Sequence, residues 1–218
     1  GVIPARYGST RFPGKPLALL QGKSVIQHVY EQAAKARLAH EVVVATDDER
    51  IAAAVGRFGG RAVMTSPTAR SGTERAAEVA RGRDEQIIIN VQGDEPLVHP
   101  SMVDQLAEHL ERHQAIPIAS LMTTLTQPED MNNPNVVKVV VDRDGFALYF
   151  SRSPIPHVRT PQGSRFKVQG SRQAPSTLNL QPSTSWKHLG IYGYQRHFLL
   201  QFPHLEPTPL EQAEQLEQ

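Results

Sequence analysis

Short runs of aliphatic and β-branched residues alternate along this chain with longer segments in which apolar residues recur at helical spacing. The nearly continuous apolar runs at 42–45 and 87–91 are typical of strands that are covered on both faces of a sheet. Helical periodicity predicts helices over 49–58, 74–81 and 101–113. This alternation indicates βαβ units, so we expect an α/β fold with a mostly parallel central sheet.

Two of these helices have a sequence signal at their start. Thr46 is followed three residues later by Glu49, and Ser71 is followed by Glu74 at the same spacing. In a capping box of this kind, the hydroxyl accepts a hydrogen bond from the first turn and the Glu side chain reaches back. Both helices are therefore expected to begin at these pairs.

The second half of the chain changes character. Strands are predicted at 116–124, 136–141, 146–150 and 189–194. The turn sequence at 142–145 joins two of them and predicts an antiparallel hairpin. Residues 153–186 contain five prolines and many polar residues, which indicates an irregular insertion or a lid.

Both chain ends read as interrupted elements. Residues 1–3 resemble the end of a buried strand, and residues 210–218 resemble a helix that stops without a cap. We expect one domain over 1–218, cut at both ends.

Composition excludes several classes of protein. The 23 Lys and Arg residues nearly balance 22 Asp and Glu, so the charge pattern gives no footprint for nucleic acid. Cysteine is absent, which rules out disulfides and thiolate chemistry. No apolar run approaches the ~20 residues needed to cross a bilayer. We expect a soluble, cytoplasmic protein with no membrane or nucleic-acid partner.

The segment 3–17 carries the first candidate chemistry. Arg6, Arg11 and Lys15 lie close together in sequence, with Gly8 and Gly14, directly after the first strand. Ligands bind beyond the carboxyl ends of strands in open α/β sheets, and glycines with cations suit a triphosphate. The spacing is not that of a Walker loop. The alternative is a surface turn with solvated basic residues.

Two further segments add to this picture. Asp94 follows the run at 87–91, where a carboxylate suits a Mg²⁺ ion that fills its shell with water and phosphate oxygens, although an ordinary turn aspartate is the alternative. The loop at 70–75 enters a helix, which leaves Thr73 and Arg75 available for a nucleotide. For Arg75 the alternative is an exposed helical residue.

In their order along the chain, these segments resemble the 3-deoxy-manno-octulosonate (Kdo) cytidylyltransferase family. The matching segments are 3–17, 45–48, 71–75, 90–96, 133–140, 147–152 and 188–194. The resemblance implies a three-layer nucleotidyltransferase fold with an antiparallel hairpin elaboration. It also implies Mg²⁺ dependence, CTP and Kdo as substrates, a homodimer, and a role in lipopolysaccharide biosynthesis.

The resemblance also implies the roles of individual residues. Arg6, Lys15 and Asp94 would be catalytic, with Asp94 as the metal ligand, and no general base is assigned. The nucleotide would lie near Ala5, Arg6, Ser9, Lys15, Thr73 and Arg75. The sugar would lie near Gln92, Arg152, His188, Tyr192, Glu211 and Gln212. A surface arginine and a structural histidine are the alternatives for Arg152 and His188.

Departures from the family pattern keep other functions open. The family's second metal-binding aspartate has no counterpart before Gln218, and the segment 153–186 is richer in Pro and Ser than expected. The chain would then bind CTP but turn it over poorly. Activation of another acidic sugar such as sialic acid is one alternative, and a non-catalytic nucleotide or sugar-phosphate binding protein is another.

Overall fold

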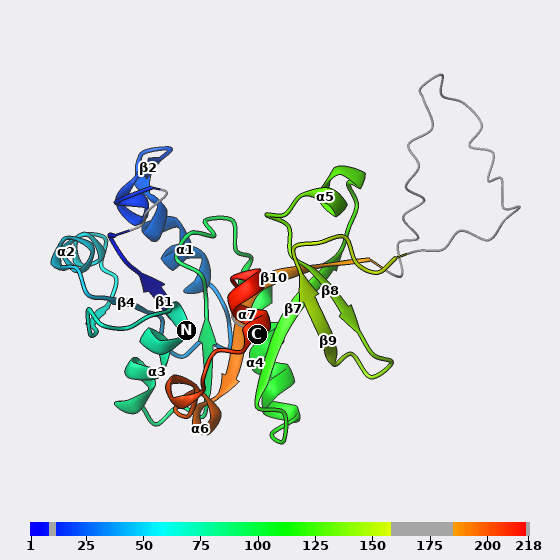
Figure 1. Ribbon diagram of the computed structural model, residues 1–218. Helices are drawn as coiled ribbons and strands as arrows, with labels where there is room; N and C mark the ends of the chain where they lie inside the picture. The colour runs from blue at the N-terminus through cyan, green and yellow to red at the C-terminus, as the bar shows by residue number, and fades with distance from the viewer. Residues whose placement is uncertain (9–11, 158–184, 217–218) are drawn as a thin grey trace, which may run out of the picture. The chain divides into compact units, whose positions relative to one another are not determined.

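The computed structural model describes residues 1–8, 12–157 and 185–216, which form two compact units (Figure 1). The first unit contains residues 1–121 and 190–206, and the second contains 122–189 and 207–218. Two strands contribute to both units: β7 (Ile118–Thr124) and β10 (Trp186–Gln195). The single domain expected over 1–218 therefore stays a prediction.

The first unit holds a mostly parallel sheet. Its strands are β1 (Val2–Ala5), β4 (Val43–Thr46), β5 (Ala62–Met64) and β6 (Ile87–Asn90), in the order β5-β4-β1-β6, and they are parallel. The second half of β10 then pairs with β6 in the antiparallel sense. Every residue of β4 is buried, as its continuous apolar run predicts. The mostly parallel sheet of the sequence prediction is confirmed.

Helices cover both faces of this sheet. Helix α3 (Gly72–Arg81) packs its alanines into a core with Val2, Val43 and Ile88. Ile89 points to the opposite face, where Leu110 of α4 (Pro100–Arg112) reaches the position at which a Cβ on Gly193 would lie. The unit also contains α1 (Val25–Ala33), α2 (Glu49–Arg57), α6 (Arg196–Leu199), η1 (Lys15–Leu17), η2 (Phe202–His204) and the short strands β2 (Leu19–Leu20) and β3 (Lys23–Ser24).

One of the two predicted helix caps is correct and the other is wrong. The Ser71 side chain accepts from the Glu74 N–H, so α3 has its predicted N-cap, but the capping box is incomplete because the Glu74 carboxylate accepts from the Arg70 N–H. Helix α2 is capped instead by Asp48, whose side chain accepts from the Arg50 N–H. Thr46 lies too early in the chain for this role, and its hydroxyl accepts from the Asp48 N–H.

The second unit is built on the predicted hairpin. Strands β8 (Lys138–Val141) and β9 (Ala147–Ser151) are antiparallel, and residues 186–187 of β10 pair with β8. Helices α5 (Pro128–Asn132) and α7 (Pro209–Glu214) complete the unit. Helix α7 ends at Glu214, with Gln215 in the left-handed conformation as its C-cap, so the expectation of a helix running to 218 is wrong.

Lys138 is the most unusual core residue of the second unit. Its side chain is fully buried, and its Nζ donates to the backbone carbonyls of Asn133, Val136 and Arg152. Burial lowers the pKa of Lys138 below its ordinary value. The ammonium therefore ties the segment before β8 to the end of β9.

No helix among the described residues is long and apolar enough to cross a membrane. Most of the predicted irregular segment 153–186 lies outside the described residues.

Candidate functional site

The loops after β1 and β6 bring two of the predicted catalytic residues into contact. Lys15 begins η1 and Asp94 follows β6, and Lys15 Nζ lies 2.6 Å from Asp94 Oδ2. Their side chains are 39% and 54% exposed, so the pair is accessible to a ligand. Arg6 is exposed directly after β1. Cationic and anionic groups suited to a metal–triphosphate therefore meet at the carboxyl ends of the parallel strands.

Gly93 allows this approach. A Cβ at Gly93 would lie 2.5 Å from the backbone oxygen of Pro4, a contact that a larger residue could make only if β1 moved. The following turn is closed by the Glu95 N–H, which donates to the Gln92 carbonyl. The glycine thus holds the loop that carries Asp94 against the end of β1.

The start of α3 adds polar groups at the same end of the sheet. Thr73 is buried, and its hydroxyl accepts from the Asn90 side-chain amide at 3.4 Å. The Asn90 Oδ1 atom is buried and has no hydrogen-bond partner among the described residues. It lies in the interior beside Thr73, which is predicted to contact the nucleotide.

Arg75 is not the exposed helical residue that the sequence left open. Its guanidinium is buried, donates to the Thr65 hydroxyl at 2.7 Å and to the Ser66 carbonyl at 3.1 Å, and lies 2.9 Å from the Asp47 carboxylate. These contacts join α3 to the ends of β4 and β5. Arg75 therefore supports the site from within, and its predicted contact with the nucleotide stays a prediction.

Arg152, predicted to bind the sugar carboxylate, is occupied by backbone carbonyls in the second unit. It donates through Nε to Glu214, through Nη1 to Pro134 and through Nη2 to Gln215. In return, the Glu214 carboxylate accepts from the Arg152 N–H and from the hydroxyls of Ser151 and Tyr149. The two residues clamp the end of α7 to β9, so Arg152 could bind a carboxylate only by leaving these carbonyls.

His188 is a neutral residue of the second unit. Burial lowers the pKa of His188 to about 4, because an imidazolium there would lose its hydration. Its ring lies 4.7 Å from that of Phe150, edge to face. At neutral pH its neutral ring can donate one hydrogen bond and accept another, but it contributes no positive charge to a sugar site.

The remaining predicted residues are placed as follows. Ala5 is buried at the end of β1, and Gln92 is half-buried. Tyr192 of β10 stacks with Tyr194 at 6.1 Å between ring centroids. Glu211 forms a capping box with Thr208 at the start of α7, in which its carboxylate accepts from the Thr208 N–H. Gln212 is exposed. Ser9 lies outside the described residues.

The residues at the carboxyl edge fit a magnesium ion that arrives with a triphosphate. Across the described ranges, no group of three or more His, Asp or Glu side chains could hold a metal by itself. Mg²⁺ commonly takes one or two carboxylates and completes its shell with phosphate oxygens and water. Asp94 already holds a cation, the Lys15 ammonium, so its carboxylate suits this role.

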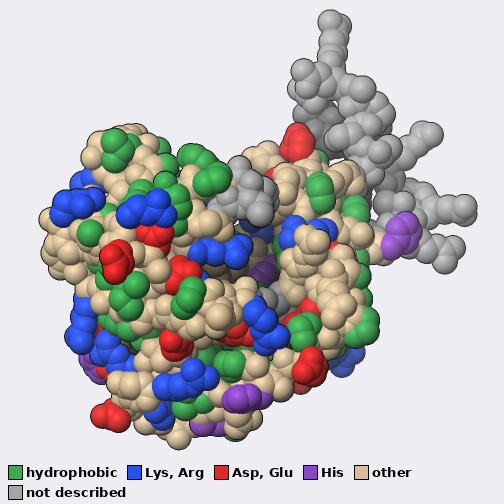
Figure 2. All heavy atoms as spheres, turned by 60° about the vertical axis from the view of Figure 1, so that its left-hand side comes forward, with side chains coloured by type: hydrophobic (Ala, Val, Ile, Leu, Met, Phe, Trp, Pro, Cys, Tyr) green, Lys and Arg blue, Asp and Glu red, His purple; other side chains and the backbone are tan. Residues whose placement is uncertain are grey.

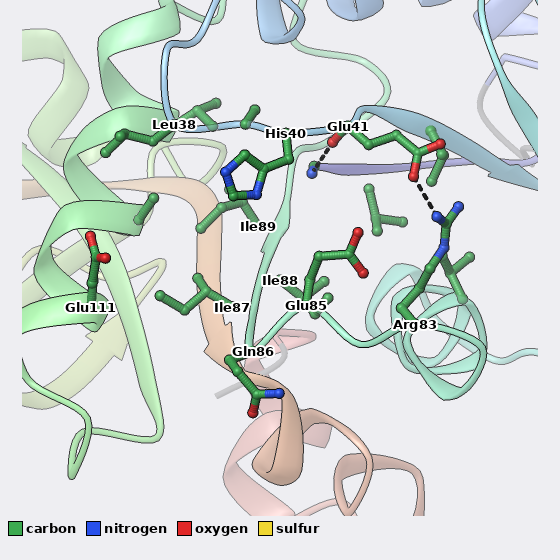
Figure 3. A pocket seen from close by; sticks show the side chains of 17 residues that line it. Leu38, His40, Glu41, Arg83, Glu85, Gln86, Ile87, Ile88, Ile89 and Glu111 are labelled. Carbon is green, nitrogen blue, oxygen red and sulfur yellow. Dashed lines mark hydrogen bonds and ion pairs between the residues drawn. The ribbon is translucent and has the colours of Figure 1, made fainter.

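A hollow lies at the opposite edge of the sheet, at the amino end of β6 (Figure 3). Its lining includes Ile87 and the acidic residues Glu41, Glu85 and Glu111, and the Glu41 carboxylate pairs with Arg83. Acidic side chains and the amino ends of strands both disfavour a triphosphate. The carboxyl edge is therefore the better candidate.

Charge is dispersed over the face of the molecule that Figure 2 presents. Basic and acidic side chains are interspersed over this face. An anion on this face would therefore be bound by a local group of basic side chains, and not by a broad positive surface.

Comparison with known proteins gives one consistent result. A family model described as cytidylyltransferase matches residues 1–218. The 3-deoxy-manno-octulosonate cytidylyltransferase of Geotalea uraniireducens is 51% identical over 218 residues, covering 100% of this chain and 83% of the relative. The protein of the same name from Myxococcus xanthus is 49% identical over 218 residues, covering 100% of this chain and 80% of the relative.

Solved structures agree with these relatives. A CMP:2-keto-3-deoxy-manno-octonic acid synthetase complexed with CTP superposes with a TM-score of 0.84 at 43% identity, over 99% of this chain and 81% of that chain. A cytidylyltransferase from Leptospira borgpetersenii has a TM-score of 0.57 at 16% identity, over 96% of this chain and 65% of that chain, and shares the fold.

Proposed function

Because this chain belongs to the cytidylyltransferase family, and within it to the 3-deoxy-manno-octulosonate cytidylyltransferases, we propose that it transfers CMP from CTP to Kdo and releases pyrophosphate. The observation that carries the chemistry is the Lys15–Asp94 pair at the carboxyl ends of β1 and β6. The relatives' names favour Kdo over sialic acid as the acceptor.

In the proposed reaction, the anomeric hydroxyl oxygen of Kdo attacks the α-phosphorus of CTP. The bond between that phosphorus and the bridging oxygen breaks, and pyrophosphate leaves with the electron pair. Lys15 and Arg6 stabilise the charge that develops on the leaving group, which is the electrostatic contribution expected of preorganised cations. We assign no general base to the hydroxyl proton.

Asp94 would hold Mg²⁺ with the triphosphate oxygens. When bound, the ion would neutralise phosphate charge and fix the orientation of the nucleotide. In the free protein the Lys15 ammonium donates to Asp94 Oδ2, and the phosphate oxygens of CTP would compete with Asp94 for this ammonium. Nucleotide binding would thus draw Lys15 toward phosphate and free Asp94.

Four residues complete the proposed sites. Thr73 lies beside the nucleotide, and Gln92, His188 and Tyr192 contact the sugar. The sugar-carboxylate role of Arg152, the homodimer, the cytoplasmic location and the place in lipopolysaccharide biosynthesis stay predictions of the resemblance.

A substrate screen tests this function. Each of the four nucleoside triphosphates is incubated with Kdo or with sialic acid in the presence of Mg²⁺, and pyrophosphate release is measured. Release with CTP and Kdo alone is expected. Equal release with sialic acid would contradict the proposed acceptor, and CTP binding without release would favour a non-catalytic nucleotide-binding protein.

A further inference from the structure

Tyr7 and Gly14 close the two ends of the loop that leads to Lys15. The Gly14 N–H donates to the Tyr7 carbonyl at 2.9 Å. Gly14 has a left-handed φ of 72°, and a Cβ at this position would lie 3.1 Å from two carbons of the Tyr7 ring. The ring therefore packs directly against the residue that precedes Lys15.

Arg50, from the first turn of α2, holds the Tyr7 ring. The guanidinium carbon of Arg50 lies 3.4 Å from the ring centroid, a cation–π arrangement. The Arg50 side chain is 60% exposed, so burial does not fix its position. Contacts with its neighbours must do so.

Asp48 supplies that support. Its carboxylate accepts from Arg50 Nε at 2.9 Å and from Arg50 Nη2 at 2.6 Å, a bidentate pair. The Asp48 N–H in turn donates to the Thr46 hydroxyl at the end of β4. The sheet thus connects through Asp48 and Arg50 to the Tyr7 ring, and through Gly14 to Lys15.

We propose that Arg50 and Tyr7 are positioning residues for CTP, which act by holding Lys15 in the place where it meets the triphosphate. The Arg50 guanidinium is paired with the Asp48 carboxylate, so Arg50 acts by positioning the Tyr7 ring and not by offering its charge to the triphosphate. A Lys15 backbone that is held in place before binding loses less conformational entropy when the ligand arrives. The inference rests on CTP being the substrate, as proposed above.

The test combines CTP binding by calorimetry with KM values for both substrates. Arg50→Ala is expected to weaken CTP binding by about two- to fivefold. This range follows from the free energy of an exposed cation–π contact, since a change of about 1.4 kcal/mol alters a dissociation constant tenfold. Tyr7→Leu should weaken binding at least as much, since it removes the ring from both partners. The KM for Kdo should stay unchanged in both variants.

Conservative variants separate positioning from general stability. Tyr7→Phe keeps the ring and should bind CTP close to the wild type, whereas Arg50→Lys keeps the charge but loses the fork and should fall between wild type and Arg50→Ala. Asp48→Asn should resemble Arg50→Ala, and the double variant should add little to either. Arg57→Ala removes the same charge from an exposed position at the other end of α2 and should have no effect.

Three results would overturn the proposal. A loss of CTP affinity in Arg50→Ala without one in Tyr7→Leu would mean that Arg50 contacts the nucleotide itself. An equal loss in Arg57→Ala, or an equal rise in the KM for Kdo, would indicate a general effect of charge or stability. Failure of the wild-type protein to bind CTP would refute the proposed function separately, before any variant is compared.

Discussion

We expect Asp94 to change partners when the substrate binds. In the free protein the carboxylate holds the Lys15 ammonium at 2.6 Å, and in the proposed complex it holds a metal ion. The pair is partly exposed, and such pairs are commonly worth about 0.2–1 kcal/mol. It is therefore weak enough for a triphosphate to separate.

Asp94→Asn should therefore improve CTP binding in the absence of divalent cations but reduce turnover in the presence of Mg²⁺. Without divalent cations, the variant should bind CTP about two- to fivefold more tightly than wild type, because Lys15 is released and a negative charge is removed. With Mg²⁺, its turnover should fall by about 10²–10³ or more. Calorimetry in EDTA and a pyrophosphate assay in Mg²⁺ measure the two effects.

Lys15→Met provides the control for this experiment. In that background, Asp94→Asn reports only the lost repulsion, so the double-mutant cycle isolates the contribution of the pair. Weaker CTP binding by Asp94→Asn in EDTA would refute the competition between Asp94 and the triphosphate for Lys15.

Two glycines should respond in opposite ways to the same substitution. Gly93→Ala places a methyl group 2.5 Å from the Pro4 carbonyl and should destabilise the protein by about 2 kcal/mol or more. Gly56→Ala, in an exposed position of α2 with nothing within 4 Å of the new Cβ, should stabilise it by about 0.5–1 kcal/mol. Denaturant unfolding measures both, and a stable Gly93→Ala would mean that the loop and β1 can separate.

At the scale of elements, the sequence predicted what depends on local patterns. The strands at Val43–Thr46 and Ile87–Asn90 left continuous apolar runs because they are covered on both faces. Helix α1 was missed, although Ile26, Val29 and Ala33 follow helical spacing and are all buried. Its apolar pattern covers only nine residues, and Ser24 makes no side-chain cap at its start.

Partners that are distant in sequence could not be predicted in this way. Arg152 and Glu214 are 62 residues apart, and nothing local to either residue indicates their clamp. The burial of Arg75 likewise depends on Thr65 and Asp47, which different strand ends bring together. The sequence therefore predicted which loops form the site, but not the contacts that Arg75 and Arg152 make within the protein.

The clamp on α7 predicts a dependence on pH. The hydroxyl of Ser151, together with the Arg152 N–H and the Tyr149 hydroxyl, lowers the pKa of Glu214 below its ordinary value of 4.5. Because the folded pKa is the lower one, the stabilisation is present above pH 4.5 and is lost as the pH falls through the folded pKa. The stability difference between wild type and Glu214→Gln should therefore shrink below that pH.

Urea unfolding over a pH series measures this difference. Glu111→Gln, at an exposed position of α4, is the matched control and should show little change with pH. A constant difference between wild type and Glu214→Gln from neutral to acidic pH would show that the clamp does not depend on the charge of Glu214.

At the scale of the molecule, Lys15, proposed to bind CTP, and His188, proposed to bind the sugar, lie in different units. Lys15 belongs to the first unit and His188 to the second. Lys15→Met should therefore raise the KM for CTP more than that for Kdo, and His188→Gln should do the opposite. Equal effects of either variant on both substrates would contradict this division.

The low pKa of His188 sharpens that comparison. A base whose folded pKa is depressed to about 4 stays neutral at neutral pH, and its burial costs stability only as the pH falls from its ordinary 6.5 toward 4. The pH profiles of the KM for Kdo should then be parallel for wild type and His188→Gln between about pH 6 and 8. An inflection near 6.5 that disappears in the variant would show that His188 binds the sugar as a cation.

The three carbonyls around the Lys138 ammonium also determine how this lysine reacts. Acylating reagents need an accessible, unprotonated amine, and Lys138 is fully enclosed, whereas Lys23 and Lys35 are exposed. Lys138 should therefore be acetylated only when the segment before β8 opens, at a rate that mass spectrometry can follow. The rate of its modification therefore measures how often the second unit opens locally. Labelling as fast as that of Lys35 would mean that the unit opens freely.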